Sequence, residues 1–222
     1  MKNLYNALNL KKLLTLKELG VEYVEPVKEF KDAPLELPNE LTSLQQIVNQ
    51  CHLCELSKSR TNVVFGEGNK NAEIMFVGEG PGATEDATGR PFVGRAGELL
   101  TKMIENVLHI PRSSVYIANI VKCRPPNNRV PTPKEALSCK PYLQKQIDII
   151  KPKIIVALGS TAYSYLTNDN QTISKARGNI IDMQDFKLIA TYHPSYLLRN
   201  PSAKKEVYLD LLKVKDLLNI TN

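Results

Sequence analysis

The stretch Ile74-Met75-Phe76-Val77-Gly78-Glu79-Gly80-Pro81-Gly82 predicts a buried strand that ends in a tight, glycine-rich turn. Three more short apolar runs follow it, at residues 115–121, 154–158 and 187–190. Segments with helical periodicity separate these runs, at residues 96–108, residues 133–150 and the stretch after Ser160. Strands that alternate with helices imply a mainly parallel sheet covered on both faces. We therefore expect an α/β fold, a three-layer sandwich with a mainly parallel central sheet and helices on both faces.

The first forty residues differ in character from the rest of the chain. Leucines recur at helical spacing among lysines between Leu4 and Leu19, and Gly20 follows them. Residues 21–40 contain three prolines among charged residues and show little periodicity, which is typical of a linker. We expect residues 1–40 to form an N-terminal helical extension with its linker, and residues 41–222 to form the main domain.

Three positions have the residue types that begin helices. Thr42 is placed to cap a short helix that runs through Gln50, and Ser202 is placed to cap a terminal helix. The sequence Thr-Pro-Lys-Glu at residues 132–135 has the pattern of a capping box with proline at the first helical position. Each pattern predicts the residue at which a helix starts.

Composition and charge narrow the class of protein. The chain has 222 residues, a formal net charge of +6 and a pI near 9.0. A basic balance suits a nucleic-acid partner or an anionic surface, although many ordinary soluble proteins share it. No apolar run approaches the ~20 residues that span a bilayer, and lysines interrupt any candidate secretory signal. We expect a cytoplasmic, nucleoid-associated monomer in a reducing compartment, with no membrane partner.

Four cysteines are candidates for a metal site. Cys51 and Cys54 form a CxxC pair, Cys123 follows an apolar strand, and Cys139 lies on a predicted helix. A CxxC supplies two ligands of one metal, and two further thiolates complete a tetrahedral set. Zinc and an iron–sulfur cluster both accept four thiolates, and the spacing does not separate them. Unrelated buried cysteines or a disulfide are the plainer alternatives, but a reducing compartment favours metal binding over disulfides.

Polar side chains follow the predicted strands at their carboxyl ends, where ligands gather in such folds. Glu79, Glu85 and Asp86 follow the first strand, Asn119 lies near the end of the second, and His193 follows the fourth. Taken singly, each has a plain structural alternative, such as a surface acid, a turn amide or a structural histidine. The glycine-rich turn matches neither a Walker loop nor the GxGxxG dinucleotide fingerprint. Their convergence at one edge predicts a functional site.

Basic residues gather around two of these segments. The loop at residues 122–134 carries four cations and no acid: Lys122, Arg124, Arg129 and Lys134. The segment after His193 carries three more: Arg199, Lys204 and Lys205. Such side chains can neutralise phosphates and set the register of a protein on a duplex, and the alternative is a solvated basic face.

Together these residues resemble the uracil-DNA glycosylase superfamily, in particular its iron–sulfur class, often called family 4. The first motif of that class is similar to GEGPG at residues 78–82 and TGRPFVG at residues 88–94. The middle motif is similar to NIVKCRPPNNR at residues 119–129, and the last to TYHPSYLLR at residues 191–199. The likeness runs from about Leu41 to the C-terminus, and the motifs and cysteines agree in order.

The resemblance implies a cofactor and a reaction. The cofactor is a [4Fe-4S] cluster, and its implied ligands are Cys51, Cys54, Cys123 and Cys139. The reaction is the removal of uracil from single- or double-stranded DNA by hydrolysis of its N-glycosidic bond, which leaves an abasic site. The uracil must be flipped out of the duplex to be reached.

The resemblance also implies roles for individual residues. Gly80 and Pro81 belong to the pocket wall, Phe92 stacks on the base, Asn119 bonds its Watson–Crick edge, and His193 stabilises the departing uracil anion. The implied DNA contacts are Arg124, Arg129, Ser195 and Arg199.

The group that positions water is left open by the resemblance. The best-known branch of the superfamily carries a water-activating aspartate where Gly80 stands and a thymine-excluding tyrosine where Gly82 stands. Family 4 has the same glycines as this chain. Glu79 and Glu85 are the candidates, and the sequence does not choose between them.

Two other interpretations compete with this one. A non-enzymatic, nucleic-acid-binding accessory protein could hold zinc on the same cysteines, but such a module does not need Phe92, Asn119 and His193 together. A branch of the superfamily that traps the sugar covalently uses an inserted basic loop with a histidine. No such insertion follows Leu100, and His109 is followed by Ile-Pro rather than by arginines.

Overall fold

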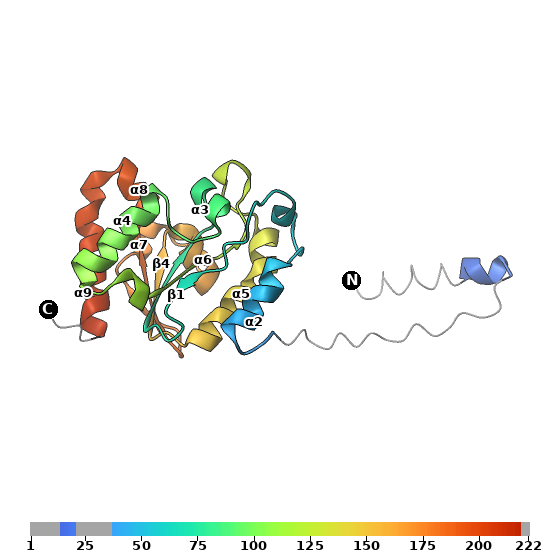
Figure 1. Cartoon of the computed structure of the whole chain (residues 1–222), viewed down its shortest axis with the longest axis horizontal. Coiled ribbons are helices and arrows are strands. Elements are labelled where there is room, and N and C mark those ends of the chain that lie inside the picture. The colour runs from blue at the N-terminus through green and yellow to red at the C-terminus, as the bar shows by residue number, and fades with distance from the viewer. Residues whose placement is uncertain (1–13, 21–36, 219–222) are drawn as a thin grey trace. The chain divides into compact units, whose positions relative to one another are not determined.

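The computed structural model describes residues 14–20 and 37–218 of the chain (Figure 1). The chain divides after Glu36, and residues 37–222 form the larger unit. Residues 14–18 are helical, and Gly20 follows them with a φ of 82°. The rest of the expected N-terminal helix and most of the expected linker lie outside the described residues. None of the described helices is long and apolar enough to cross a membrane.

The described residues form a six-stranded sheet at the centre of the larger unit. Four parallel strands lie side by side in the order β3 (Tyr116–Asn119), β2 (Ile74–Gly78), β4 (Ile154–Leu158) and β6 (Lys187–Thr191). Two short antiparallel strands form the edges, β1 (Glu67–Gly68) beside β3 and β5 (Ile180–Asp182) beside β6. The mainly parallel sheet is confirmed. The sequence does not predict the edge strands, because two or three residues are too few to show a period.

Helices cover both faces of this sheet (Figure 1). One face is covered by α2 (Leu41–Asn49), α5 (Pro133–Ile150), α6 (Ser160–Thr167) and α7 (Ile173–Ala176). The other is covered by α4 (Arg95–Met103), α8 (Pro194–Arg199) and α9 (Lys204–Leu217). The short α3 (Ala83–Thr88) lies between β2 and α4 in the chain.

Each face of the sheet has its own apolar core. On β4, Ile155 and Ala157 belong to one core, and Ile154, Val156 and Leu158 belong to the other. Successive side chains of a strand point to opposite faces, so a strand covered on both faces is apolar throughout. The α/β three-layer sandwich expected from the sequence is confirmed.

The order of the parallel strands leaves a crevice at one end of the sheet. The chain leaves β2, passes through α4 on one face to β3, and then passes through α5 on the other face to reach β4 on the opposite side of β2. The connections that leave β2 and β4 therefore diverge, and the space beyond their carboxyl ends is a ligand position in such folds. Glu79 follows β2 there, and Gly159 follows β4.

The expected helix starts are right at one position and wrong at two. Thr132 caps α5 in a complete capping box. The cap of α2 is Glu40 rather than Thr42, because the Glu40 carboxylate accepts a hydrogen bond from the backbone N of Thr42 at 2.9 Å. Ser202 lies inside a 3-10 turn, Pro201–Ala203, that precedes α9, so it is not the cap of that helix.

Candidate active site

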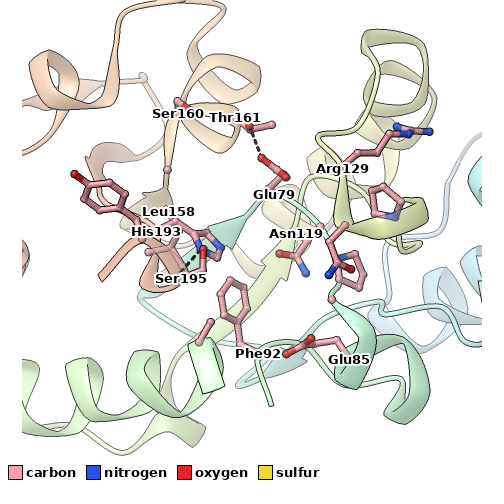
Figure 2. A pocket seen from close by; sticks show the side chains of 18 of the residues that line it. Glu79, Glu85, Phe92, Asn119, Arg129, Leu158, Ser160, Thr161, His193 and Ser195 are labelled. Carbon is pink, nitrogen blue, oxygen red and sulfur yellow. Dashed lines mark hydrogen bonds between the residues drawn. The ribbon is translucent and has the colours of Figure 1, made fainter. Parts of the chain in front are cut away.

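A cavity of about 490 Å³ opens at this crevice (Figure 2). Its volume lies within the ~300–1,000 Å³ range of small-molecule sites. Segments that follow β2, β3, β4 and β6 all contribute to its lining. The lining includes these residues singled out in the sequence: Glu79, Gly80, Pro81, Glu85, Phe92, Asn119, Arg129, His193, Ser195 and Arg199. Arg124 is not among the lining residues.

Phe92 contributes an aromatic face to the cavity. It is 6% exposed and has a φ of 52°, a left-handed backbone conformation that is unusual for an aromatic residue. The Glu85 carboxylate holds this turn, because its Oε1 accepts hydrogen bonds from the backbone N of Val93 at 3.0 Å and of Gly94 at 2.9 Å. Gly97 allows the close approach, since a Cβ there would lie 1.9 Å from the Phe92 carbonyl oxygen. Backbone strain of this kind persists where the surroundings enforce it, often at functional sites.

Asn119 presents an unpaired amide oxygen at the cavity. The residue is 1% exposed, and its Oδ1 is the one buried side-chain N or O atom among the described residues that has no hydrogen-bond partner. Gly78 makes room for this side chain, because a Cβ at that position would lie 2.5 Å from Asn119 Oδ1 and 2.5 Å from Phe92 Cζ. An unpaired buried acceptor costs about 1–3 kcal/mol. The amide is therefore poised to receive a donor from a ligand.

His193 lies across the cavity from Asn119 (Figure 2), with its ring centroid 5.6 Å from that of Phe92. Its Nδ1 accepts a hydrogen bond from the backbone N of Ser195 at 3.1 Å and lies 2.8 Å from the Ser195 hydroxyl. A backbone N–H can only donate, so in the neutral ring the proton is on Nε2. Burial, assisted by the charge of Arg199, lowers the pKa of His193 to about 4. The ring is therefore a neutral Nε2–H donor near pH 7.

The two candidate carboxylates have different partners. Glu79 lines the cavity, and its Oε2 accepts a hydrogen bond from the Thr161 hydroxyl at 2.5 Å (Figure 2). The Oε1 of Glu85 instead accepts hydrogen bonds from the backbone of the turn that follows Phe92. Glycine at position 82 leaves room for the other oxygen, since a Cβ there would lie 2.8 Å from Glu85 Oε2. Thr161 carries no motif in the sequence, and its place shortly after the β4 strand is the one local sign of its role.

Gly80 and Pro81 form the turn that follows β2. A Cβ on Gly80 would lie 2.8 Å from the Val121 side chain, so glycine allows this turn to pack against the segment after β3. Pro81 is buried. The turn therefore presents backbone, rather than a side chain, to this part of the cavity.

The basic residues differ in how free they are to bind phosphate. Arg199 lines the cavity, is exposed, and forms no ion pair with another described residue. Arg129 is paired with Glu135 through hydrogen bonds of 2.8 and 2.7 Å. Arg124 donates to a neighbouring asparagine side chain at 2.8 Å. The expectation that Lys122 joins this basic face is wrong, because the residue is 1% exposed and points into the protein.

The four cysteines line one small cavity together with two cations, Arg60 and Lys122. Arg60 Nη1 donates to Cys123 Sγ at 3.2 Å, and the backbone N of Lys122 donates to Cys139 Sγ at 3.4 Å. Burial raises the pKa of Cys139 to about 12. In residues 14–20 and 37–218, no three Cys, His, Asp or Glu side chains are close enough together to hold a single metal ion.

The family model of the uracil DNA glycosylase superfamily matches residues 65–213, a range that contains the whole cavity. The chain belongs to this superfamily. Within it, the chain is similar to proteins described as type-4 uracil-DNA glycosylases, as the resemblance implied. The protein of that description from Thermotoga maritima is 53% identical over 77% of this chain and 91% of its own length. Those from Sulfurisphaera tokodaii and Archaeoglobus fulgidus are 48% and 43% identical, each over 80% of this chain, and over 84% and 94% of their own lengths.

Proposed function

We propose that this protein is a DNA-repair enzyme, a uracil-DNA glycosylase of the type-4 class that flips uracil out of DNA and hydrolyses its N-glycosidic bond. The observation that carries this proposal is the buried, unpaired amide oxygen of Asn119 in a cavity large enough for a base, which Phe92 and His193 also line. A module that only binds nucleic acid has no use for this combination.

Asn119 distinguishes uracil from cytosine by its pattern of donors and acceptors. Uracil N3–H donates to Asn119 Oδ1, and the amide NH₂ donates to uracil O4. Cytosine has an acceptor at N3 and an amino group at position 4, so both contacts fail. A site built to hydrogen-bond its substrate rejects an analogue that leaves polar groups unpaired, by about 10⁴–10⁵-fold in favourable cases. Phe92 covers the flat face of the flipped base.

His193 acts on the leaving group. When the bond from the sugar to uracil N1 breaks, its electron pair passes to the base, and negative charge develops on uracil O2. The Nε2–H of the neutral ring donates to that oxygen, and the Ser195 backbone N holds the ring by bonding Nδ1 at 3.1 Å. A fixed donor aimed at developing charge contributes about 10²–10³-fold in rate.

Glu79 is the group that positions water, and Glu85 is a positioning residue. Glu79 lines the cavity, and only its Oε2 is engaged by a described residue, Thr161. Its Oε1 is left to accept a hydrogen bond from the attacking water. Glu85 holds the Phe92 turn through two backbone N–H groups, so it acts through the aromatic ring rather than on the water.

The cysteines hold a [4Fe-4S] cluster. The four cysteines line one cavity, which suits a single group held by four thiolates. Hydrogen bonds from Arg60 and from the Lys122 backbone to sulfur favour anionic thiolates. When bound, the cluster cross-links the three chain segments that supply its ligands.

The partner is DNA that contains uracil. Arg199 and Ser195 lie at the cavity, where the phosphates beside a flipped nucleotide would pass. Arg129 can contact phosphate only in competition with Glu135. The monomeric state and the cytoplasmic, nucleoid-associated location remain predictions.

One assay on anaerobically purified protein tests the proposal. Single-stranded and duplex oligonucleotides with one central uracil should yield an abasic site, seen as strand cleavage after alkali. Matched oligonucleotides with cytosine or thymine at the same position should stay intact. The same preparation should contain iron and show broad visible absorbance. A protein that binds these oligonucleotides without cleaving them and carries one zinc per chain would instead be the accessory protein considered above.

A further inference from the structure

Lys122 is a buried cation with only neutral acceptors. It is 1% exposed, and its Nζ donates to the main-chain O of Asn119 at 3.0 Å and to Gln146 Oε1 at 2.6 Å. No carboxylate of the described residues forms an ion pair with it. Burial disfavours an ammonium unless an opposite charge offsets it. A negative charge from a group other than Asp or Glu would therefore stabilise the charged form of Lys122.

The cysteine cavity is the place where the fold can provide that charge. Lys122 and Arg60 both line it, and the backbone N of Lys122 already donates to Cys139 Sγ at 3.4 Å. Arg60 likewise bonds Cys123 Sγ and backbone oxygens, rather than a carboxylate. A cluster held by four thiolates is anionic, and its potential responds to nearby charge and hydrogen bonds. One anionic group would offset both cations.

The same ammonium holds the uracil-reading residue. Its bond to the Asn119 carbonyl fixes the main chain at the end of β3, while the Asn119 side chain faces the substrate cavity. Gln146 fixes the ammonium in turn. Its Nε2 donates to the Phe65 carbonyl at 2.9 Å and to the Tyr116 hydroxyl at 3.1 Å, so the network is anchored on α5 and on the sheet.

We propose that Lys122 couples the two sites: the anionic cluster balances its charge, and its ammonium holds the main chain of Asn119 where the side chain reads uracil. Lys122 touches neither the base nor the irons, so it is a positioning residue. The proposal has two parts. The pocket end, in which Lys122 positions Asn119, rests on the proposed glycosylase function. The cluster end, in which the cluster balances the charge of Lys122, rests only on the cysteine ligands, and each end has its own measurement.

The cluster end is tested by reduction potential. Lys122→Met removes the ammonium and keeps the length of the side chain. Lys140→Met is the matched control. Lys140 is next to Cys139 in the sequence, and its replacement removes the same charge, but its side chain is exposed. Potentiometric titration followed by visible absorbance and electron paramagnetic resonance should give a more negative potential for Lys122→Met, since a buried positive charge no longer favours the added electron. Water screens the exposed charge, so Lys140→Met should match the wild type. Equal potentials in all three proteins overturn the coupling.

The pocket end is tested by single-turnover cleavage of a uracil-containing duplex. Lys122→Met should be slower by about 10- to 10²-fold, because a small displacement of a substrate-binding group has effects of that size, and Lys140→Met should be normal. Amide exchange in residues 119–123 should quicken only in Lys122→Met. A shifted potential with a normal cleavage rate refutes the pocket end. Suppose that the wild type holds iron but cleaves no uracil, and that Lys122→Met still has the more negative potential. That result refutes the proposed function and supports the interaction between Lys122 and the cluster.

A second variant tests the same proposal if Lys122→Met does not accumulate as a folded protein with its cluster. Gln146→Glu is isosteric and places a carboxylate against the ammonium, which neutralises the charge and keeps the bond to Asn119. Its potential should also become more negative, with visible absorbance per chain unchanged. A potential equal to that of the wild type overturns the proposal.

Discussion

Replacing Asn119 with leucine should abolish uracil cleavage and leave the fold as stable as before or more stable. Leucine has nearly the shape of asparagine but neither donates nor accepts. The variant loses both bonds to the Watson–Crick edge of uracil, so the single-turnover rate should fall by about 10⁴-fold. The wild-type Oδ1 is buried without a partner, and removing an unpaired acceptor should raise the free energy of unfolding by about 1 kcal/mol. A loss of activity together with a gain in stability would show that the Asn119 amide serves ligand binding rather than the stability of the fold.

Gln146→Leu provides the matched control. Gln146 is also a buried amide, at 0% exposure, but its oxygen and nitrogen are bonded to Lys122, Phe65 and Tyr116. Its loss leaves several buried groups unpaired and should lower the free energy of unfolding by about 2–3 kcal/mol or more. Denaturant titration of the iron-loaded proteins gives the stabilities, and quenched cleavage of a uracil duplex gives the rates. If Asn119→Leu is destabilised as much as Gln146→Leu, or cleaves uracil normally, the amide is structural and the pocket assignment fails.

Three further predictions concern the pocket and its rim. The single-turnover rate should stay level from about pH 8 to about pH 5 and fall near pH 4, because His193 remains neutral down to its pKa of about 4; a halved rate at pH 6.5 contradicts this. Glu79→Gln should lower kcat by about 10²–10⁴-fold with little change in KM. Glu85→Gln, which loosens the Phe92 turn, should mainly raise KM, and the reverse pattern would exchange their roles. Arg199→Ala should weaken binding to all DNA sequences and reduce the salt slope by about one, whereas Arg129→Ala should do less because that guanidinium is already paired; binding that ignores salt concentration would show that neither arginine meets phosphate.

Local patterns in the chain were enough to predict its architecture. The apolar runs at residues 74–77, 154–158 and 187–190 became central strands, and the capping box at Thr132 began α5. These features depend on the period of apolar residues and on hydrogen bonds between residues close in sequence, which a linear chain already contains. The order of strands and helices then restricts the sheet to a mainly parallel one with an open crevice at its carboxyl end. The same order of elements predicts that polar residues after the strands lie at one edge, and Glu79, Asn119 and His193 line one cavity there.

What each polar group is bonded to was decided only by the tertiary structure. Lys122 sits among prolines and arginines in the sequence, yet it is buried because Gln146, 24 positions later, supplies its partner. Nothing in the sequence distinguishes the carboxylates of Glu79 and Glu85. Their hydrogen-bond partners differ in the structure, because Glu79 accepts from the Thr161 hydroxyl and Glu85 accepts from the backbone of the Phe92 turn. The energy of a polar group depends on its burial and on partners that folding brings from distant segments, and neither quantity has a period or a local pattern to read. For the same reason no neighbour in the sequence reveals that the side-chain oxygen of Asn119, Oδ1, is left without a donor until a ligand arrives.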